Sequence, residues 1–171
     1  MEILTLILLS TLPCLVIAGG LRDLTTMKIP NWISVALILC FFPTAFLVGL
    51  PPMTVAIHFG VAVVALLVGM GLFAMRVIGG GDAKLMAAVC LWLGITGSGM
   101  FILWTALAGG LVCVVLILAR RELRPYVMGA PAWIDTLLEP KGDLPYGVAV
   151  AIGALMAFPS SILLTTFSAS H

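Results

Sequence analysis

Two aspartates, Asp23 and Asp82, stand out in a sequence that carries only 7 acidic residues. Each lies beside a long apolar run, so both are expected near the ends of membrane helices. Ionisable groups next to lipid usually have a partner or a task, although their cost is lower near helix ends than at the bilayer centre. Two carboxyl groups that meet cannot both ionise, so one serves as base and the other as acid. Such a pair predicts peptide-bond hydrolysis by an activated water, with no metal and no cofactor.

Each aspartate also has a purely structural interpretation. Asp82 follows Gly79-Gly80-Gly81, which is a turn signal, and aspartate is a favoured helix N-cap residue. Asp23 can be a charge at a helix end that Arg22 or Lys28 neutralises. Both interpretations are compatible with a catalytic pair, because a carboxylate can hold a helix end and still face a substrate.

The composition indicates that this chain is embedded in a membrane. Of its 171 residues, 63% are hydrophobic and 9% are charged, which lies far outside the usage of soluble proteins. We therefore predict an all-α polytopic membrane protein, with residues 1–171 forming a single membrane-embedded domain in contact with the lipid bilayer. The formal net charge of +1 offers no basic field, so nucleic-acid binding is excluded. Nothing in the sequence specifies an oligomeric state.

Five apolar runs are long enough to be membrane segments: Ile3–Leu21, Trp32–Leu50, Met53–Met75, Leu85–Ala119 and Pro145–Phe167. The first run lacks a basic n-region, so we interpret it as a permanent span and not as a secretory signal. The fourth run would form a rod of roughly 50 Å, which exceeds the thickness of the bilayer core. We expect it to fold back at Gly94-Ile95-Thr96-Gly97-Ser98-Gly99, giving a bundle of six transmembrane helices.

The distribution of basic residues supports this count. Six spans place the three polar segments 21–31, 76–84 and 120–144 on one side of the membrane. The positive-inside rule makes that side cytoplasmic and turns both termini outward, whereas five spans would divide the basic residues between the two sides. Those segments contain every lysine and arginine of the chain, namely Arg22, Lys28, Arg76, Lys84, Arg120, Arg121, Arg124 and Lys141.

The remaining features of the apolar runs have ordinary interpretations. The four cysteines, Cys14, Cys40, Cys90 and Cys113, are widely spaced and are interpreted as small core residues. His58 has no neighbouring metal ligands and is expected to be packed or hydrogen-bonded. Small residues are typical of close helix packing in lipid, as expected for Gly60, Gly69, Gly71, Gly109 and Gly110.

Three motifs resemble a known family. Gly79-Gly80-Gly81-Asp82-Ala83-Lys84-Leu85 resembles the GxGD motif of the prepilin peptidases, which are membrane aspartyl proteases. Asp23-Leu24-Thr25-Thr26-Met27-Lys28-Ile29-Pro30-Asn31 resembles their first motif, an aspartate followed by Ile-Pro-Asn. Leu144-Pro145-Tyr146-Gly147 resembles the start of their last helix. The motifs occur in the family's order, so the resemblance covers almost the whole chain.

The resemblance implies an aspartic-type endopeptidase that removes the short basic leader of a prepilin, typically after glycine, at the cytoplasmic face. Its catalytic residues would be Asp23 and Asp82. Because glycine has no side chain, an extended substrate backbone could come close to Asp82. The candidate substrate-binding residues are Gly79, Gly80, Gly81, Pro30 and Asn31.

The chain departs from the larger family members, which carry a cysteine-rich cytoplasmic segment and also methylate the new N-terminus. Only residues 21–31 join the first two spans here, so the methyltransferase activity and its cofactor are not carried over. The chain is similar to the small form that accompanies Flp/Tad-type pili. We therefore expect a multi-pass protein of a prokaryotic inner membrane, with an Flp-type prepilin as its substrate partner.

Three alternatives remain open at this point. Archaeal preflagellin peptidases are close relatives of the small form. Presenilin-like proteases share GxGD, but their first aspartate belongs to a Tyr-Asp pair, whereas Arg22 precedes Asp23 here. A small transporter or a pilus-assembly subunit could use the two acids as a proton relay, although transport would place carboxylates nearer the middle of the membrane.

Two groups of charged residues outside the motifs have weaker functional interpretations. The acidic residues Asp135, Glu139 and Asp143 could attract a basic leader, but Lys141 lies among them, so a solvated face is the preferred interpretation. Lys84 follows Asp82 closely and could contact substrate, yet a lysine that extends toward the headgroups is ordinary at this position.

Overall fold

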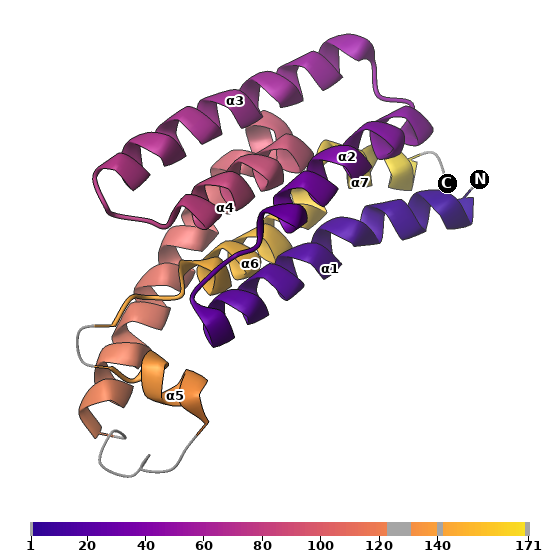
Figure 1. Ribbon diagram of the computed structural model, residues 1–171. Coiled ribbons are helices and arrows are strands. Elements are labelled where there is room, and N and C mark those ends of the chain that lie inside the picture. The colour runs from indigo at the N-terminus through magenta and orange to yellow at the C-terminus, as the bar shows by residue number, and fades with distance from the viewer. Residues whose placement is uncertain (1, 123–130, 140–141, 170–171) are drawn as a thin grey trace.

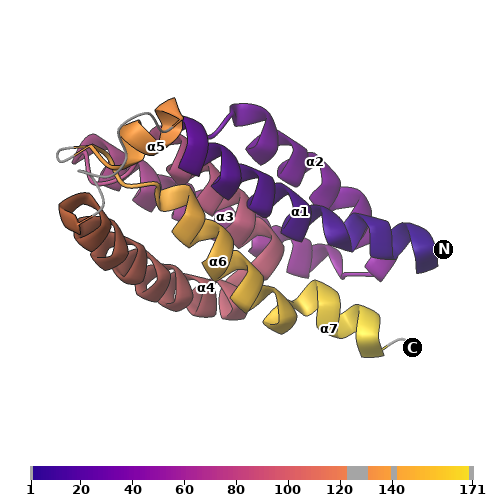
Figure 2. The same cartoon turned by 90° about the horizontal axis from the view of Figure 1, so that it is seen from below.

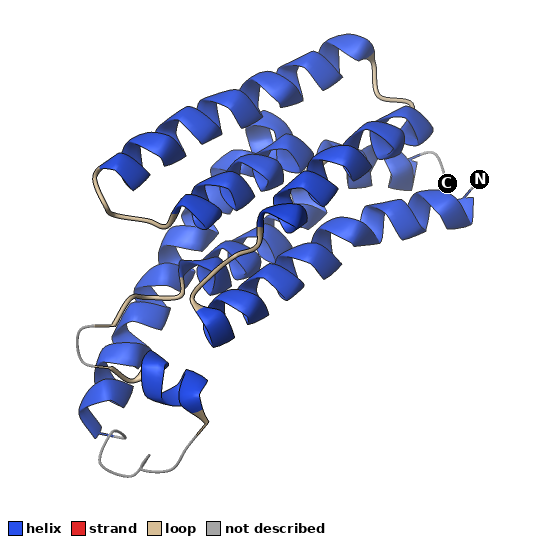
Figure 3. Ribbon diagram, in the orientation of Figure 1, coloured by secondary structure: helices blue, strands red, loops and turns tan. Residues whose placement is uncertain are grey.

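The computed structural model describes residues 2–122, 131–139 and 142–169, and these segments form helices joined by short loops (Figure 3). The predicted all-α class is therefore confirmed. Arg124 and Lys141 lie outside the described residues. The elements in chain order are α1 (Glu2–Thr26), α2 (Asn31–Val48), α3 (Pro52–Ala74), α4 (Gly80–Glu122), α5 (Ala132–Leu137), α6 (Tyr146–Ala157), the 3-10 turn η2 (Phe158–Ser160) and α7 (Ile162–Ala169).

Within the described residues, 5 helical stretches are long and apolar enough to cross a membrane. They are α1, α2, α3, α4 and the continuous stretch Tyr146–Ala169, so a polytopic membrane protein is confirmed. The first helix differs from the sequence prediction in one useful respect. It continues past Leu21 to Thr26, which places Asp23 in the last helical turns and not in a loop.

The α4 segment of 43 residues is not one continuous helix, because its backbone breaks at Gly94. There φ is 65° and ψ is −164°, a region that is essentially restricted to glycine. The chain doubles back at this residue (Figure 1). The turn is therefore sharper than predicted, since residues 95–99 of the expected turn segment are already helical. We call residues 80–93 the first half of α4 and residues 95–122 its second half.

The first half of α4 is the centre of the bundle. Its residues from Ala87 to Leu93 are all at most 7% exposed, because neighbouring helices cover every side of it. The indole N–H of Trp92 donates a hydrogen bond of 2.9 Å to the Leu37 carbonyl of α2. A buried tryptophan that satisfies its N–H in this way fixes the separation of the two helices.

His58 of α3 stabilises the break in α4. Its side chain is 3% exposed, stacks on the Phe41 ring with a centroid separation of 5.7 Å and lies 2.8 Å from the Leu91 carbonyl through Nδ1. Carbonyls in the last turn before a helix end lack their helical partner, so His58 supplies the missing donor beside Gly94. The prediction of a packed, hydrogen-bonded histidine is confirmed.

Close helix contacts are made at fewer glycines than expected. A β-carbon added at Gly69 would lie 3.0 Å from the β-carbon of Ala83, so α3 and α4 touch there. Gly109 has only an ordinary contact, at 3.6 Å, and Gly60, Gly71 and Gly110 have nothing within 4 Å. Within the described residues, the expected close helix contact is therefore present at Gly69 and absent at the three open glycines.

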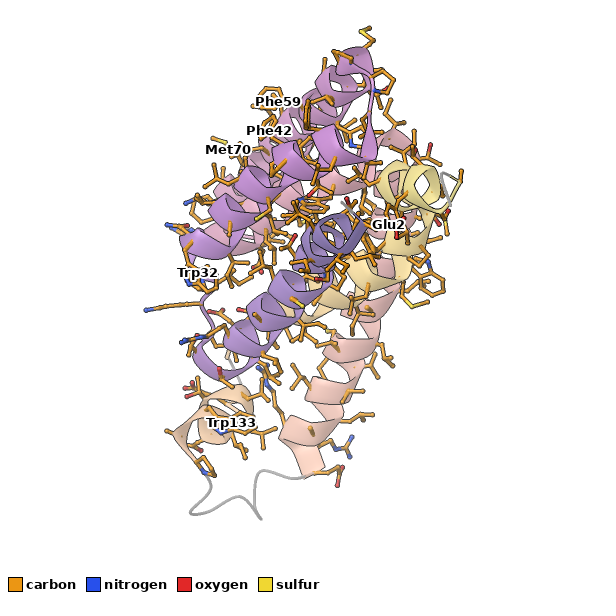
Figure 4. All side chains as sticks on the ribbon, turned by 90° about the vertical axis from the view of Figure 1, so that its right-hand side faces the viewer. Glu2, Trp32, Phe42, Phe59, Met70 and Trp133 are labelled. Atoms are coloured by element: carbon orange, nitrogen blue, oxygen red, sulfur yellow. The ribbon has the colours of Figure 1, made fainter. Side chains whose placement is uncertain are left out.

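The assignment of the cysteines to the core is confirmed for Cys90, with Cys40 packed against the core, and is wrong for Cys14. Cys90 is buried, Cys40 and Cys113 are half-buried and Cys14 is exposed. Large apolar side chains cover much of the outer surface as well, including Phe42, Phe59 and Met70 on α2 and α3 (Figure 4). An apolar exterior is what a chain dissolved in lipid requires.

The bundle has two distinct ends. The start of α1 and the helix α7 lie at one end, while the α1–α2 link, the α3–α4 link and α5 lie at the other (Figures 1 and 2). The described lysines and arginines all belong to the helix ends and links of this second end. Arg120 holds α5 and the start of α6 there, because Nε donates to the Leu137 carbonyl at 3.0 Å and Nη2 to the Asp143 carbonyl at 2.8 Å.

Candidate active site

Asp23 is held by the first residues of α6. Its side chain is 6% exposed, and its Oδ2 accepts a hydrogen bond of 2.7 Å from the backbone N–H of Gly147. One turn earlier on α1, a β-carbon at Gly20 would lie 3.0 Å from that of Ala151, so the two helices almost touch. This close approach explains how a carboxylate on α1 reaches a backbone N–H at the start of α6.

Asp82 lies in the first turn of α4. Gly80 is the first helical residue, so Gly79 is the N-cap residue and Asp82 occupies the third helical position. Its Oδ2 accepts a hydrogen bond of 3.1 Å from the backbone N–H of Gly79, which is the reciprocal half of a capping box. The interpretation of Asp82 as the N-cap is wrong in this respect, because its side chain reaches back to the cap from inside the helix.

One oxygen of Asp82 is left without a partner. The residue is 8% exposed, and Oδ1 makes no hydrogen bond to any of the described residues. A buried acceptor with no partner is costly, and such positions are common where a substrate or water completes the bonding. Asp82 is therefore a fixed carboxyl group with one free oxygen.

Asp23 and Asp82 line the same pocket, which has a volume of about 270 Å³. The pocket opens at the end of the bundle that carries the α1–α2 and α3–α4 links. Its other lining residues include Met27, Phe73, Arg76, Asp143 and Tyr146.

The Ile-Pro-Asn segment connects α1 to α2 and packs against the starts of α4 and α6. The backbone of Ile29 would lie 3.1 Å from a β-carbon at Gly81, and its Cδ1 would lie 2.8 Å from one at Gly147. Ile29 thus fills the space between α4 and α6 directly beside both carboxylates. Pro30 is the N-cap residue of α2, and Asn31 Oδ1 accepts a hydrogen bond of 2.9 Å from Lys84 Nζ.

The comparison with family models decides the identity. Residues 10–114 match the model of the type IV leader peptidase family. The chain belongs to this family. No curated protein and no solved structure matches it. The resemblance found in the motifs is therefore confirmed, and with it an aspartic-type leader peptidase that is embedded in the membrane by several helices.

The matched residues contain both aspartate motifs of this leader peptidase and end before residues 144–147. The structure brings that last motif to the same site, because Gly147 contacts Asp23 and Tyr146 lines the pocket. Sequence reasoning identified the Pro-Tyr motif only by resemblance and did not include Gly147 among the site residues. The sequence showed only a glycine at the start of a helix. The importance of this glycine depends on its contact with Asp23, which lies 124 residues earlier in the chain.

The three glycines before Asp82 have different surroundings in the peptidase. A β-carbon at Gly79 would lie 2.8 Å from Asp82 Oδ2, and one at Gly81 would lie 3.1 Å from the Ile29 backbone. One at Gly80 would meet only the Phe73 ring, at 3.4 Å. None of the three has a positive φ, so their small size matters here and their flexibility does not. Gly79 also lines the pocket, whereas the open side of Gly81 is filled by Ile29.

Two pocket residues had no signal in the sequence. Met27, directly after α1, and Arg76, two residues after the end of α3, have φ values of 52° and 58°, and both line the pocket. Positive φ is uncommon outside glycine and occurs mainly where the surrounding structure requires it. Arg76 makes no ion pair with any described residue, so its charge is available at the rim of the pocket.

The other charged candidates differ in whether they line the pocket. Asp143 lines the pocket, while Asp135 lies on α5 and does not. Lys84 is engaged with Asn31 and so has a defined partner at the surface. Among the described residues, no group of three or more histidine, cysteine or acidic side chains is placed to hold a metal ion.

Proposed function

We propose that this peptidase removes the basic leader of Flp-type prepilins at the cytoplasmic membrane face, with Asp23 and Asp82 as its catalytic pair. The observation that carries the proposal is the shared pocket. Two carboxyl groups from helices distant in sequence line it, and each is fixed by a backbone N–H. Rigidly held acids with little need to reorganise are the arrangement that enzymes use for acid–base catalysis.

The mechanism follows from the proton shared by such a pair. The ionised carboxylate takes a proton from water as the water oxygen attacks the carbonyl carbon of the scissile peptide bond. The protonated partner donates its proton to the carbonyl oxygen, which gives a tetrahedral intermediate. When the C–N bond breaks, the first carboxyl group gives its proton to the departing amine. The second takes a proton back from a hydroxyl of the intermediate as the carbonyl re-forms, so the pair ends with one proton as it began.

The short α1–α2 link favours the small, Flp-type form. α1 ends at Thr26 and α2 begins at Asn31, so residues 27–30 alone join the two helices. This link is too short to contain a cysteine-rich methyltransferase segment. We therefore propose that the peptidase cleaves its substrate and leaves the new N-terminus unmethylated.

The same geometry supports six membrane crossings with the pocket toward the cytoplasm. The break at Gly94 divides α4 into 14 and 28 residues, either of which fits a bilayer better than a single helix of 43 residues. Both termini then lie on the outer side, opposite the links that carry the described basic residues (Figure 1). The positive-inside rule assigns those links to the cytoplasm.

Cleavage by the purified protein tests the substrate assignment. The protein in liposomes would be given an Flp-type prepilin, an archaeal preflagellin or a prepilin of the larger type IV class. Mass spectrometry would then identify each new N-terminus. We expect rapid cleavage of the Flp-type prepilin to an unmethylated product. Faster cleavage of the preflagellin would assign the chain to the archaeal type, and a methylated product would contradict the small-form assignment.

A further inference from the structure

A second cavity meets the active-site pocket at Asp82. It is an apolar groove of about 350 Å³ between the two halves of α4, the start of α6 and the end of α3. Asp82 lines this groove as well as the pocket that it shares with Asp23. Its other lining residues include Met86, Gly109, Gly110, Cys113 and Val150.

The groove extends from the active site toward the interior of the membrane. Asp82 and Tyr146 lie in the first turns of α4 and α6, and Met86 and Val150 lie one turn deeper on the same helices. Along the second half of α4 the lining runs from Ile102 to Cys113. At 1.5 Å per residue this is about 16 Å, or roughly half of the hydrocarbon thickness.

The wall of the groove is open because two consecutive residues have no side chain. The nearest atom to a β-carbon at Gly109 would be 3.6 Å away, and Gly110 has nothing within 4 Å. Gly109 therefore has one ordinary contact, with Ala149 of α6, and Gly110 has none within the described chain. In lipid, small residues on a helix surface let the backbone of another helix approach closely.

The unpartnered oxygen of Asp82 is a second and independent sign of a ligand. This side chain is 8% exposed and Oδ1 has no hydrogen-bond partner among the described residues. An apolar lipid tail cannot supply a partner for it. A peptide that passes from the groove into the pocket brings carbonyl and amide groups to that oxygen, whereas lipid filling the groove leaves it unsatisfied.

We propose that this groove docks the apolar helix of the substrate that begins just after the scissile bond. The proposal rests on the proposed function. A segment within lipid must satisfy its own backbone, so the docked segment is helical along Gly109 and Gly110. The scissile bond lies at Asp82, and the polar leader occupies the pocket with Asp23 and Asp143. Asp82 thus lies at the junction between the extended leader and the membrane helix of the substrate.

Filling the groove tests this directly. Gly110→Leu adds a side chain to open space and should leave the fold intact, while it blocks the approach of a second helix. Gly60→Leu is a matched control, since Gly60 also has nothing within 4 Å but lies on α3 outside the groove. We expect Gly110→Leu to lower prepilin cleavage at least tenfold and Gly60→Leu to leave it unchanged, at equal membrane levels. Equal cleavage by the two variants would overturn the docking proposal.

Cross-linking separates docking from catalysis. Cys113 lines the groove. An Asp23→Asn variant that also carries Cys14→Ala and Cys40→Ala keeps two cysteines, Cys113 and Cys90, and Cys90 is buried. A prepilin with single cysteines placed along its apolar helix should form a disulfide with Cys113 under mild oxidation. Adding Cys113→Ser should abolish the product.

The outcomes of the two experiments distinguish the two proposals. Cleavage by the unmodified peptidase without a Cys113 disulfide at any helix position would refute docking and leave the proposed function standing. A Cys113 disulfide without cleavage by the unmodified peptidase would support docking and refute the proposed function.

Discussion

The backbone N–H of Gly147 lies 2.7 Å from Oδ2 of Asp23, which joins the first helix of the bundle to the start of α6. The contact depends on the absence of a side chain at this position. A β-carbon there would lie 2.8 Å from Asp23 Cβ and 2.9 Å from Oδ2. Gly147 is therefore a positioning residue for the candidate catalytic carboxylate.

Gly147→Ala should nearly abolish cleavage. The added methyl group has to displace Asp23 or Ile29, and a displacement of about 1 Å at a catalytic group can cost about 100-fold in rate. Gly99→Ala is a suitable control, because nothing lies within 4 Å of a β-carbon at Gly99. The measurement is the initial rate of leader cleavage. Rates within twofold of the parent for Gly147→Ala would show that the Asp23 contact does not position the acid.

The three glycines before Asp82 should differ in their tolerance of alanine. A β-carbon at Gly81 meets the Ile29 backbone at 3.1 Å, which cannot move away without shifting the α1–α2 link. The β-carbon at Gly80 meets an exposed Phe73 ring at 3.4 Å, and that ring can rotate. We expect Gly81→Ala to lower the cleavage rate at least tenfold and Gly80→Ala to stay near the parent rate. The reverse order would contradict the packing role of Ile29.

Asp143 should contribute to leader binding through its charge. It is an exposed acid on the wall of the active-site pocket, and its backbone is held by Arg120. An exposed ion pair with a basic leader residue is worth at most about 1 kcal/mol, or roughly fivefold in KM. Asp143→Asn should raise KM by up to that factor without changing kcat, and Asp135→Asn on α5 should change neither. An equal effect of both variants would point to a general charge effect.

The break in α4 should be essential for stability. Gly94 has a φ of 65°, and a β-carbon there would lie 2.6 Å from Nε2 of His58. Residues forced into such sparsely populated backbone regions cost of order 1–3 kcal/mol, and the collision adds to this. Gly94→Ala should therefore lower the midpoint of thermal unfolding in detergent well below that of Gly99→Ala. Identical midpoints would show that the fold does not depend on this conformation.

Much of the architecture could be predicted because membrane helices follow simple rules of length and hydropathy. The apolar runs located the helices, and the excess length of the fourth run indicated the fold-back. The break itself occurs at Gly94 with its unusual backbone angles, whereas Gly97 and Gly99 remain helical. Composition alone cannot tell which glycine of such a segment turns, because that depends on the contact with His58.

The site was predictable in part for a different reason. Asp23 and Asp82 are unusual by their chemistry and position, so local sequence was sufficient to select them. The residues that hold them were not, because each acts through a neighbour far away in the chain. Ile29 contacts Gly81 and Gly147, and the pattern Ile-Pro-Asn contains no information about either partner. The open surface at Gly110 could not be predicted either, because the sequence does not distinguish a glycine that packs against a helix from one that has open space beside it.

Leader cleavage by Asp23→Asn and Asp82→Asn tests the central claim most directly. Asparagine keeps the size of the side chain and removes its acid, so membrane insertion should be unchanged. Each variant would be expressed with an Flp-type prepilin at matched membrane levels, and cleavage would be read as a gel shift. We predict that the parent cleaves and that neither variant does. Normal cleavage by either variant would contradict the catalytic pair proposed for this pocket.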